Sequence, residues 1–130
     1  MRQEGYPCVF YADYYGASYT DKGYNINLVP VSKLYKLIKA RKLYAYGRQN
    51  SYLDNWDIIG WTREGDSNHS KAMAVIMSDK DSGSKWMYTG KANAKFVDYL
   101  ENRSDEIWTN SDGWGEFKCN AGSVSVWVQE

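Results

Sequence analysis

The sequence predicts a mainly β protein: an antiparallel Greek-key β-sandwich preceded by one strand and one helix. Turn-forming clusters of Gly, Asn, Asp and Ser recur roughly every 8 to 12 residues from Gln49 onward, a spacing typical of sandwiches and Greek-key barrels. Short runs of β-forming residues lie between these turns. Before Gln49 the pattern differs, because an apolar run without alternation is followed by apolar residues at helical spacing.

The opening segment is predicted to hold one buried strand and one helix. Residues 6–11 form a short apolar run, as in a strand of a parallel sheet that is covered on both faces. Leu34 and Leu37 belong to the apolar stripe of the helix, which we expect to begin after a cap at Ser32 and to stop at Gly47. We interpret the lysine-rich opposite side as a solvated face and not as a nucleic-acid-binding patch.

The remainder is predicted to be all β, so that the chain divides into an opening segment, residues 1–46, and a β-sandwich, residues 47–130. About six to eight short strands are expected in the sandwich. They include residues 57–63, 72–78, 85–89, 95–100, 115–119 and 123–128.

Alternation along the last two strands assigns their side chains to faces. Val126 is expected to face the core, which would turn Trp127 away from the core of its own sandwich. In the strand before it, Phe117 and Cys119 share one face and Trp114 lies on the other. Two tryptophans on polar faces indicate either a binding platform or a contact surface for another domain.

Composition excludes several classes of partner. Lys and Arg number 16 and Asp and Glu number 16, so no net field attracts nucleic acid or an anionic membrane. No apolar stretch reaches the roughly 18 residues of a membrane-spanning helix.

Cys8 and Cys119 fit no metal-binding spacing, and we interpret them as buried free thiols that favour a reducing compartment. His69 lies in a polar turn, and we expect no catalytic or metal role for it.

Several blocks of the chain resemble the bacterial liquefying-type α-amylases of glycoside hydrolase family thirteen. Residues 5–16 (GYPCVFYADYYG) look like their last barrel strand, and residues 39–47 (KARKLYAYG) are similar to the end of their last barrel helix. The blocks similar to their C-terminal sandwich, which occur in the same order, are residues 57–66 (DIIGWTREGD), 102–104 (NRS), 112–117 (DGWGEF) and 122–128 (GSVSVWV).

The resemblance implies that this chain is the C-terminal portion of an α-amylase. Such an enzyme carries its catalytic carboxylates on earlier strands of a (β/α)₈ barrel and hydrolyses internal α-1,4 bonds of starch or glycogen. This chain would supply the end of the barrel and a non-catalytic sandwich that stabilises it. We expect no activity from the chain alone, because Asp13 matches none of the catalytic motifs and is interpreted as a loop or helix-cap residue.

The resemblance also implies part of a calcium site between barrel and sandwich. The carboxylates of Asp57 and Asp79 and the carbonyl of Trp56 match the positions of calcium ligands. Calcium takes about six to eight oxygen ligands, so binding by this chain alone should be weak or absent. With its two cysteines, this chain is closer in cysteine content to the intracellular members of the family than to the secreted ones. This favours the cytoplasm.

A second hypothesis is a free-standing glucan-binding module. In it Trp86, Trp114 and Trp127 would be stacking platforms for the sugar rings of an α-glucan. The catalytic barrel is the expected partner under the first hypothesis. The apolar strand at residues 6–11 would also allow a homodimer to form through the barrel remnant.

Overall fold

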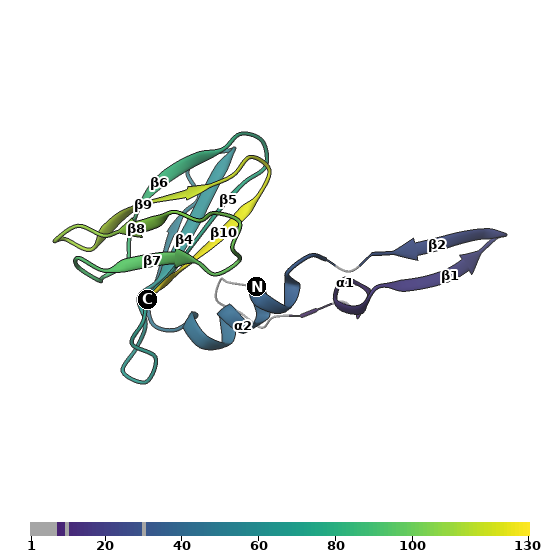
Figure 1. The fold of residues 1–130 in the computed structure, drawn as a ribbon, viewed down its shortest axis with the longest axis horizontal. Helices are drawn as coiled ribbons and strands as arrows, with labels where there is room; N and C mark the ends of the chain where they lie inside the picture. Colours follow the sequence, from purple (N-terminus) through teal and green to yellow (C-terminus); the bar gives the residue numbers. More distant parts are fainter. Residues whose placement is uncertain (1–7, 10, 30) are drawn as a thin grey trace.

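The computed structural model describes residues 8, 9, 11–29 and 31–130, and it confirms a mainly β protein with antiparallel sheets. Its main body has three layers, a two-stranded sheet, a six-stranded sheet and a helix, and a hairpin projects from this body (Figure 1). The elements are α1 (Tyr11–Tyr15), β1 (Ala17–Asp21), β2 (Tyr24–Leu28), α2 (Leu34–Tyr44), β3 (Gln49–Tyr52), β4 (Ile58–Arg63), β5 (Met73–Ser78), β6 (Gly83–Tyr88), β7 (Lys95–Asp98), β8 (Glu106–Trp108), β9 (Trp114–Cys119) and β10 (Val124–Gln129).

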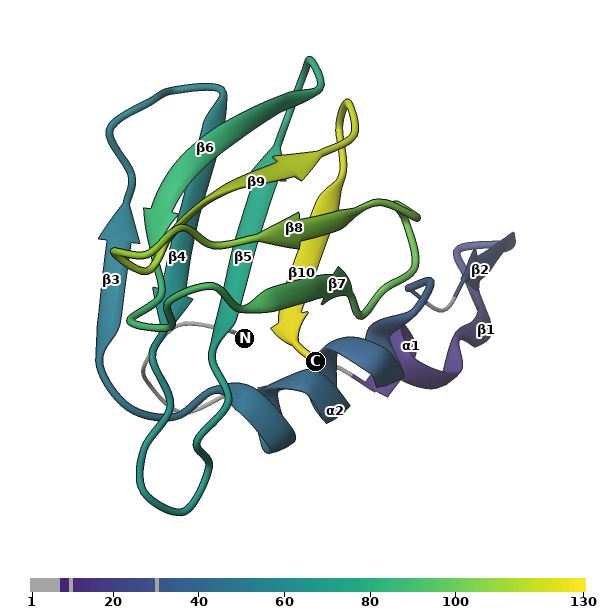
Figure 2. The ribbon, with the colours of Figure 1, turned by 60° about the vertical axis from the view of Figure 1, so that its left-hand side comes forward.

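The larger sheet has the strand order β3-β4-β5-β10-β7-β8, and β6 pairs with β9 in the smaller one. All of these pairs are antiparallel. Strand β10 therefore lies in the middle of the larger sheet, between β5 and β7 (Figure 2). The six strands expected from the sequence are all present, with ends that differ by one or two residues.

The core between the two sheets is rich in aromatic and sulfur-containing side chains. Phe117 of β9 lies 5.3 Å from Phe96 of β7 and 6.4 Å from Trp127 of β10, measured between ring centroids. Met87 and Cys119 are buried beside them. Close packing of large rings at such distances, in edge-to-face and tilted geometry, holds the sheets together.

The expectation that Trp127 faces away from the core is wrong. Its side chain is 0% exposed, and its indole Nε1 donates a hydrogen bond to the Lys118 carbonyl at 2.9 Å. The alternation itself is correct, because Val126 and Val128 point to the opposite face. Both faces of β10 are buried, however, since β10 is a central strand with a sheet on one side and a helix on the other.

Helix α2 covers the second face of the large sheet. Ala40 is fully buried against Trp61, Val75 and Val126, and Leu37 packs at the edge of this cluster. The helix begins one residue later than expected, since Lys33 and not Ser32 precedes it. Lys33 has a left-handed backbone with φ of 61° and caps the helix with no side-chain hydrogen bond.

The lysine side of α2 is only partly a solvated face. Lys33 Nζ donates a hydrogen bond to Asn102 Oδ1 at 2.6 Å, and Lys36 forms an ion pair with Glu101 at 2.8 Å. The Tyr44 ring meets the Tyr99 ring edge to face, with 6.0 Å between centroids. These contacts fasten the helix to the connection between β7 and β8.

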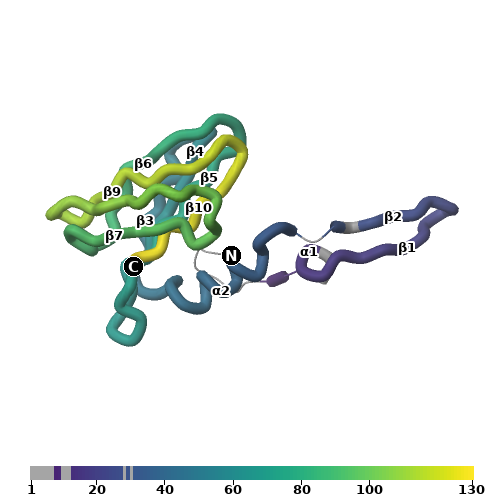
Figure 3. Tube along the Cα trace, viewed as in Figure 1, coloured from purple at the N-terminus to yellow at the C-terminus, as the bar shows by residue number. Residues whose placement is uncertain are grey.

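The strand expected at residues 6–11 lies mostly outside the described residues. Cys8 and Val9 have no regular structure, and Tyr11 begins the short helix α1. The hairpin β1–β2 follows, which was not expected from the sequence, and it extends away from the sandwich (Figure 3).

Cys119 is buried as expected, but Cys8 is exposed, which corrects the expectation of two buried thiols. Among the described residues, no helix has the length and apolar character that crossing a membrane requires.

Candidate functional site

The two aspartates expected to bind calcium lie together at one end of the large sheet. Asp57 precedes β4 and Asp79 follows β5, and pairing of Ile58 with Ser78 brings the two ends into register. The Asp79 backbone N–H donates to the Asp57 carbonyl at 3.3 Å. Oδ1 of Asp57 is shielded from solvent and has no hydrogen-bond donor among the described residues.

The neighbouring carboxyl controls the ionisation of Asp57. A hydrogen bond with the Asp79 carboxyl raises the pKa of Asp57, because one member of such a pair must keep its proton. Desolvation and the charges of Asp79 and Asp81 act in the same direction, and Lys80 opposes them weakly. A pair of adjacent carboxylates is an environment that a divalent cation would stabilise.

The turn before β4 keeps Asp57 in place. Asn55 Oδ1 accepts hydrogen bonds from the backbone N–H groups of Asp57 at 2.9 Å and Ile58 at 3.4 Å. The Trp56 side chain is exposed, so only its backbone carbonyl belongs to the proposed site. Across the part of the chain that the structure describes, no three acidic, histidine or cysteine side chains are grouped as a metal site.

The three tryptophans expected to bind sugar do not share one surface. Trp86 and Trp114 are exposed on the outer face of the β6–β9 sheet, and Trp127 is buried in the core beneath it. Trp127 is therefore removed from the candidate platform. Tyr88 lies directly opposite Trp114, with 5.7 Å between ring centroids, and Tyr52 approaches Trp114 at 6.2 Å.

An apolar cleft, which sequence reasoning missed, lies on the other side of the large sheet. It has a volume of about 350 Å³. Trp61, Val75 and Val124 of the sheet face it, and Trp61 is 7% exposed, with an indole N–H that has no acceptor among the described residues. The other lining residues are Cys8, Val9, Asp13, Val31, Leu34, Leu37 and Met77. The sequence signal that could have indicated the cleft is the second apolar face of β5 and β10. Strands with apolar residues on both faces are covered on both sides.

Asp13 and His69 each make contacts that shape the chain locally. Asp13 is exposed in the first turn of α1, and its carbonyl accepts a hydrogen bond from Val31 N–H at 2.6 Å. The His69 ring stacks on Tyr46 with 3.5 Å between centroids, and its Nδ1 lies 3.5 Å from Asp66 Oδ1. These contacts shape the loop between β4 and β5.

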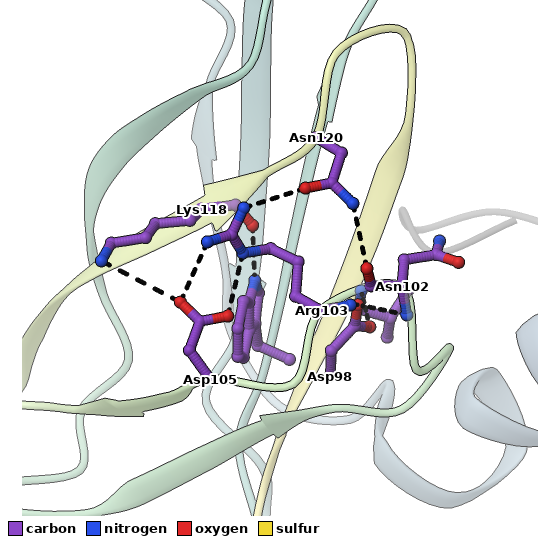
Figure 4. A network of polar contacts seen from close by, with 8 residues as sticks. Asp98, Asn102, Arg103, Asp105, Lys118 and Asn120 are labelled. Atoms are coloured by element: carbon purple, nitrogen blue, oxygen red, sulfur yellow. Dashed lines mark hydrogen bonds and ion pairs between the residues drawn. The ribbon is translucent and has the colours of Figure 1, made fainter.

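The Asn102 to Ser104 block is part of a polar network that holds the loop after β7 (Figure 4). The Asp98 carboxylate accepts backbone hydrogen bonds from Leu100, Asn102 and Arg103, and from Val126 of β10, at 3.0 to 3.1 Å. The Arg103 guanidinium binds Asp105 through two nitrogens and donates to Asn120, and Asp105 raises the pKa of Arg103. Because these charges are satisfied internally, we assign the network to the fold and not to ligand binding.

Comparisons with known proteins agree with this architecture. Residues 73–128 match the family model described as Alpha-amylase C-terminal. An α-amylase from Geobacillus stearothermophilus is 56% identical over 130 residues, which cover 98% of this chain and 23% of the relative. The cytoplasmic α-amylase of Escherichia coli strain K12 is 38% identical over 137 residues, which cover 100% of this chain and 28% of the relative. The chain thus spans about a quarter of these relatives.

Among solved structures, the crystal structure of an Anoxybacillus α-amylase has a TM-score of 0.57 to this chain. The match covers 76% of this chain and 22% of that one, at 10% sequence identity. At that identity the likeness is one of fold.

Proposed function

We propose that this chain, of which residues 73–128 match the family model described as Alpha-amylase C-terminal, forms the closing part of a bacterial-type α-amylase. Its role there is to supply a non-catalytic β-sandwich that stabilises a (β/α)₈ barrel. The barrel would carry the catalytic carboxylates and hydrolyse internal α-1,4 bonds of starch or glycogen. In this assignment residues 1–46 complete the barrel, and residues 47–130 are the sandwich.

The apolar cleft beside α2 is the observation that carries this proposal. It combines aliphatic side chains with the buried indole N–H of Trp61, which has no acceptor within residues 8, 9, 11–29 and 31–130. An unpaired donor of this kind is costly unless a partner supplies an acceptor. A packed segment of barrel would fill the apolar volume and could offer a backbone carbonyl to Trp61.

We place the calcium contribution at the Asp57 and Asp79 carboxylates and the Trp56 carbonyl. Oδ1 of Asp57 is shielded from solvent and unpaired within the part of the chain that the structure describes, and this atom and the raised pKa of Asp57 fit a hard cation bound there. These oxygens make up about half of a calcium shell, and the barrel would supply the rest. A bound ion would neutralise the two carboxylates and tie the sandwich to the barrel.

Two further proposals concern the chain in isolation and in the cell. Without a barrel, the cleft and the exposed side chains of Val9, Tyr19 and Val31 favour pairing with a second copy, so we propose a concentration-dependent homodimer. Light scattering across a hundredfold range of protein concentration tests this dimer.

We propose the cytoplasm as the compartment, because Cys8 and Cys119 are both free thiols.

A chimera tests the main proposal. The chain would replace the segment with which it aligns in the Geobacillus stearothermophilus α-amylase, and starch hydrolysis and thermal half-life would be measured. We expect an active chimera, whose half-life falls at least several-fold with Met77→Lys, because a charge then enters the cleft. Ser84→Lys, an exposed position on the outer face of the β6–β9 sheet, is the matched control.

The same Met77→Lys substitution should change the melting temperature of the isolated chain little, since Met77 is partly exposed there. Two results would refute the proposal: a folded chimera without activity, or an equal loss of half-life with Ser84→Lys and with Met77→Lys.

A further inference from the structure

The β1–β2 hairpin has two faces of opposite character. Cross-strand pairing and alternation place Tyr19, Tyr24 and Ile26 on one side, which we call the aromatic face. Tyr19 is 51% exposed and Tyr24 is 76% exposed. The opposite, polar face carries Ser18, Thr20, Asn25 and Asn27. We propose that the aromatic face docks on the rim of the catalytic barrel, against a neighbouring loop that follows another barrel strand.

The polar face is paired within the hairpin itself. Ser18 Oγ donates a hydrogen bond to Asn27 Oδ1 at 2.7 Å, and Thr20 Oγ1 donates to Asn25 Oδ1 at 3.1 Å. All four of these side chains are exposed, which suits a face that remains in water. The aromatic face instead presents ring surface beside the half-buried Ile26. The hairpin therefore needs a covering surface on one side only.

The hairpin gains little support from the rest of this chain. Strands β1 and β2 form a separate two-stranded sheet that extends away from the sandwich (Figure 3). An isolated two-stranded hairpin is marginally stable in water, because it needs packing on one face to persist. Burial of the Tyr19 and Tyr24 rings against a partner would supply that packing, and their hydroxyl groups could still reach polar groups at its edge.

The aromatic face is connected to the apolar cleft by exposed apolar residues. At the base of the hairpin, the Val31 N–H donates a hydrogen bond to the Asp13 carbonyl at 2.6 Å, and both residues line the cleft. Val29, which follows β2, and Val31 are both exposed. A partner that fills the cleft would therefore also lie close to the base of the hairpin.

The place of the hairpin in the chain indicates which surface covers it, and this assignment rests on the proposed function. Residues 6–11 are there the last barrel strand and α2 belongs to the last barrel helix, so the hairpin lies in the connection between them. Connections of this kind form the C-terminal rim of a (β/α)₈ barrel. The tip carries one acid, Asp21, and one base, Lys22, so no net charge selects a polyanion or an anionic membrane. An adjacent loop of the rim with apolar side chains fits these observations.

Adjacent substitutions on opposite faces test the docking in the chimera. Tyr19→Lys and Tyr24→Lys should each shorten its thermal half-life at least about fivefold, because a charge then enters the docked face. Thr20→Lys and Asn25→Lys are the matched controls on the polar face and should change the half-life by less than about twofold. In the isolated chain, at a concentration where it is monomeric, all four should have little effect on the melting temperature, since all four side chains are exposed there.

Proteolysis supplies a measurement that does not depend on activity. Lys22 is exposed in the turn between β1 and β2, and a lysine-specific protease cleaves after it when the hairpin opens locally. Docking opposes this opening, so cleavage after Lys22 should be at least about tenfold slower in the chimera than in the isolated chain.

Three results would overturn the docking. They are equal losses of half-life on the two faces, equal rates of cleavage after Lys22 in the chimera and in the isolated chain, and tyrosine variants that raise the KM for starch at an unchanged half-life. The last result would assign the tyrosines to substrate contact. An active chimera that responds to Met77→Lys but not to Tyr19→Lys or Tyr24→Lys would refute the docking alone, so its failure is distinguishable from failure of the proposed function.

Discussion

The carboxyl groups of Asp57 and Asp79 face each other across the ends of β4 and β5, and the second raises the pKa of the first. An acid whose pKa is raised on folding weakens the folded state once it ionises. This cost is absent below the ordinary pKa of an aspartate. It grows as the pH rises through the raised pKa of Asp57.

We therefore predict that Asp57→Asn raises the melting temperature in EDTA at about pH 7 and has little effect near pH 3, below the ordinary pKa of an aspartate. Asp112→Asn, in an exposed turn, is the control. Thermal unfolding followed by circular dichroism between these two pH values measures the difference. A loss of stability with Asp57→Asn at both pH values would show that the pair does not strain the fold.

Calcium should stabilise the isolated chain only slightly, because the two carboxylates and one carbonyl are an incomplete shell. A ligand at a hundred times its dissociation constant adds about 2.7 kcal/mol. We expect far less at about 1 mM calcium. A melting-temperature rise of roughly 5 degrees or more, abolished by Asp57→Asn or Asp79→Asn, would mean that this chain completes the site without a barrel.

The chain alone should release no reducing sugar from soluble starch above the buffer rate. Retaining glycosidases need a nucleophile and an acid about 5 Å apart on either side of the scissile bond, and Asp13 has no such setting in our assignment. The assay is run on protein purified through two columns. Activity that persists and is removed by mutating a carboxylate of this chain would contradict the assignment of catalysis to the barrel.

Asp98 should be among the most sensitive positions of the sandwich. Its carboxylate accepts four backbone N–H groups, one of them from β10. Asp98→Ala leaves these donors unpaired and should lower the free energy of unfolding by about 3 kcal/mol or more. Asp98→Asn keeps one acceptor oxygen and should lose less. Urea denaturation measures both, and an Asp98→Asn variant as stable as wild type would show that one oxygen suffices.

Removal of residues 1–46 tests the proposed boundary. The sandwich of residues 47–130 retains its own inter-sheet core, so we predict a cooperative but less stable fold. The loss arises because Trp61, Val75 and Val126 lose the cover of α2. Size-exclusion chromatography and thermal unfolding beside the full chain provide the measurement. An unfolded truncation would make α2 an integral part of the sandwich core.

Strands with regular alternation could be predicted from the sequence to within one or two residues, because turn signals bounded them. Strand β3 was not predicted, because Gln49–Tyr52 is short and polar and is positioned only by pairing with β4. The strands of the β1–β2 hairpin were not predicted, although apolar and polar residues alternate along β1 and β2, because each strand has only 5 residues. Its signal was Lys22-Gly23 between Asp21 and Tyr24, where both central residues have positive φ, as a two-residue hairpin turn requires.

For the candidate sites, local sequence was less informative. Alternation places Trp127 on one face, but only the order of strands reveals that both faces of β10 are buried. The cleft likewise depends on how α2 packs against the large sheet, and local sequence patterns do not predict that packing. The pairing of Asp57 with Asp79 was implied by resemblance and not by spacing, since the partners are 22 residues apart in the chain.

The central place of β10 also affects how the protein is made. During synthesis, β3, β4 and β5 leave the ribosome first, and β7 and β8 follow, but the strand that joins these two groups comes after them all. Until residues 124–129 emerge, β5 and β7 each present an open edge to solvent or to chaperones. The large sheet can therefore close only late, and a premature stop shortly before Val124 would leave two unjoined halves of a sheet that could aggregate.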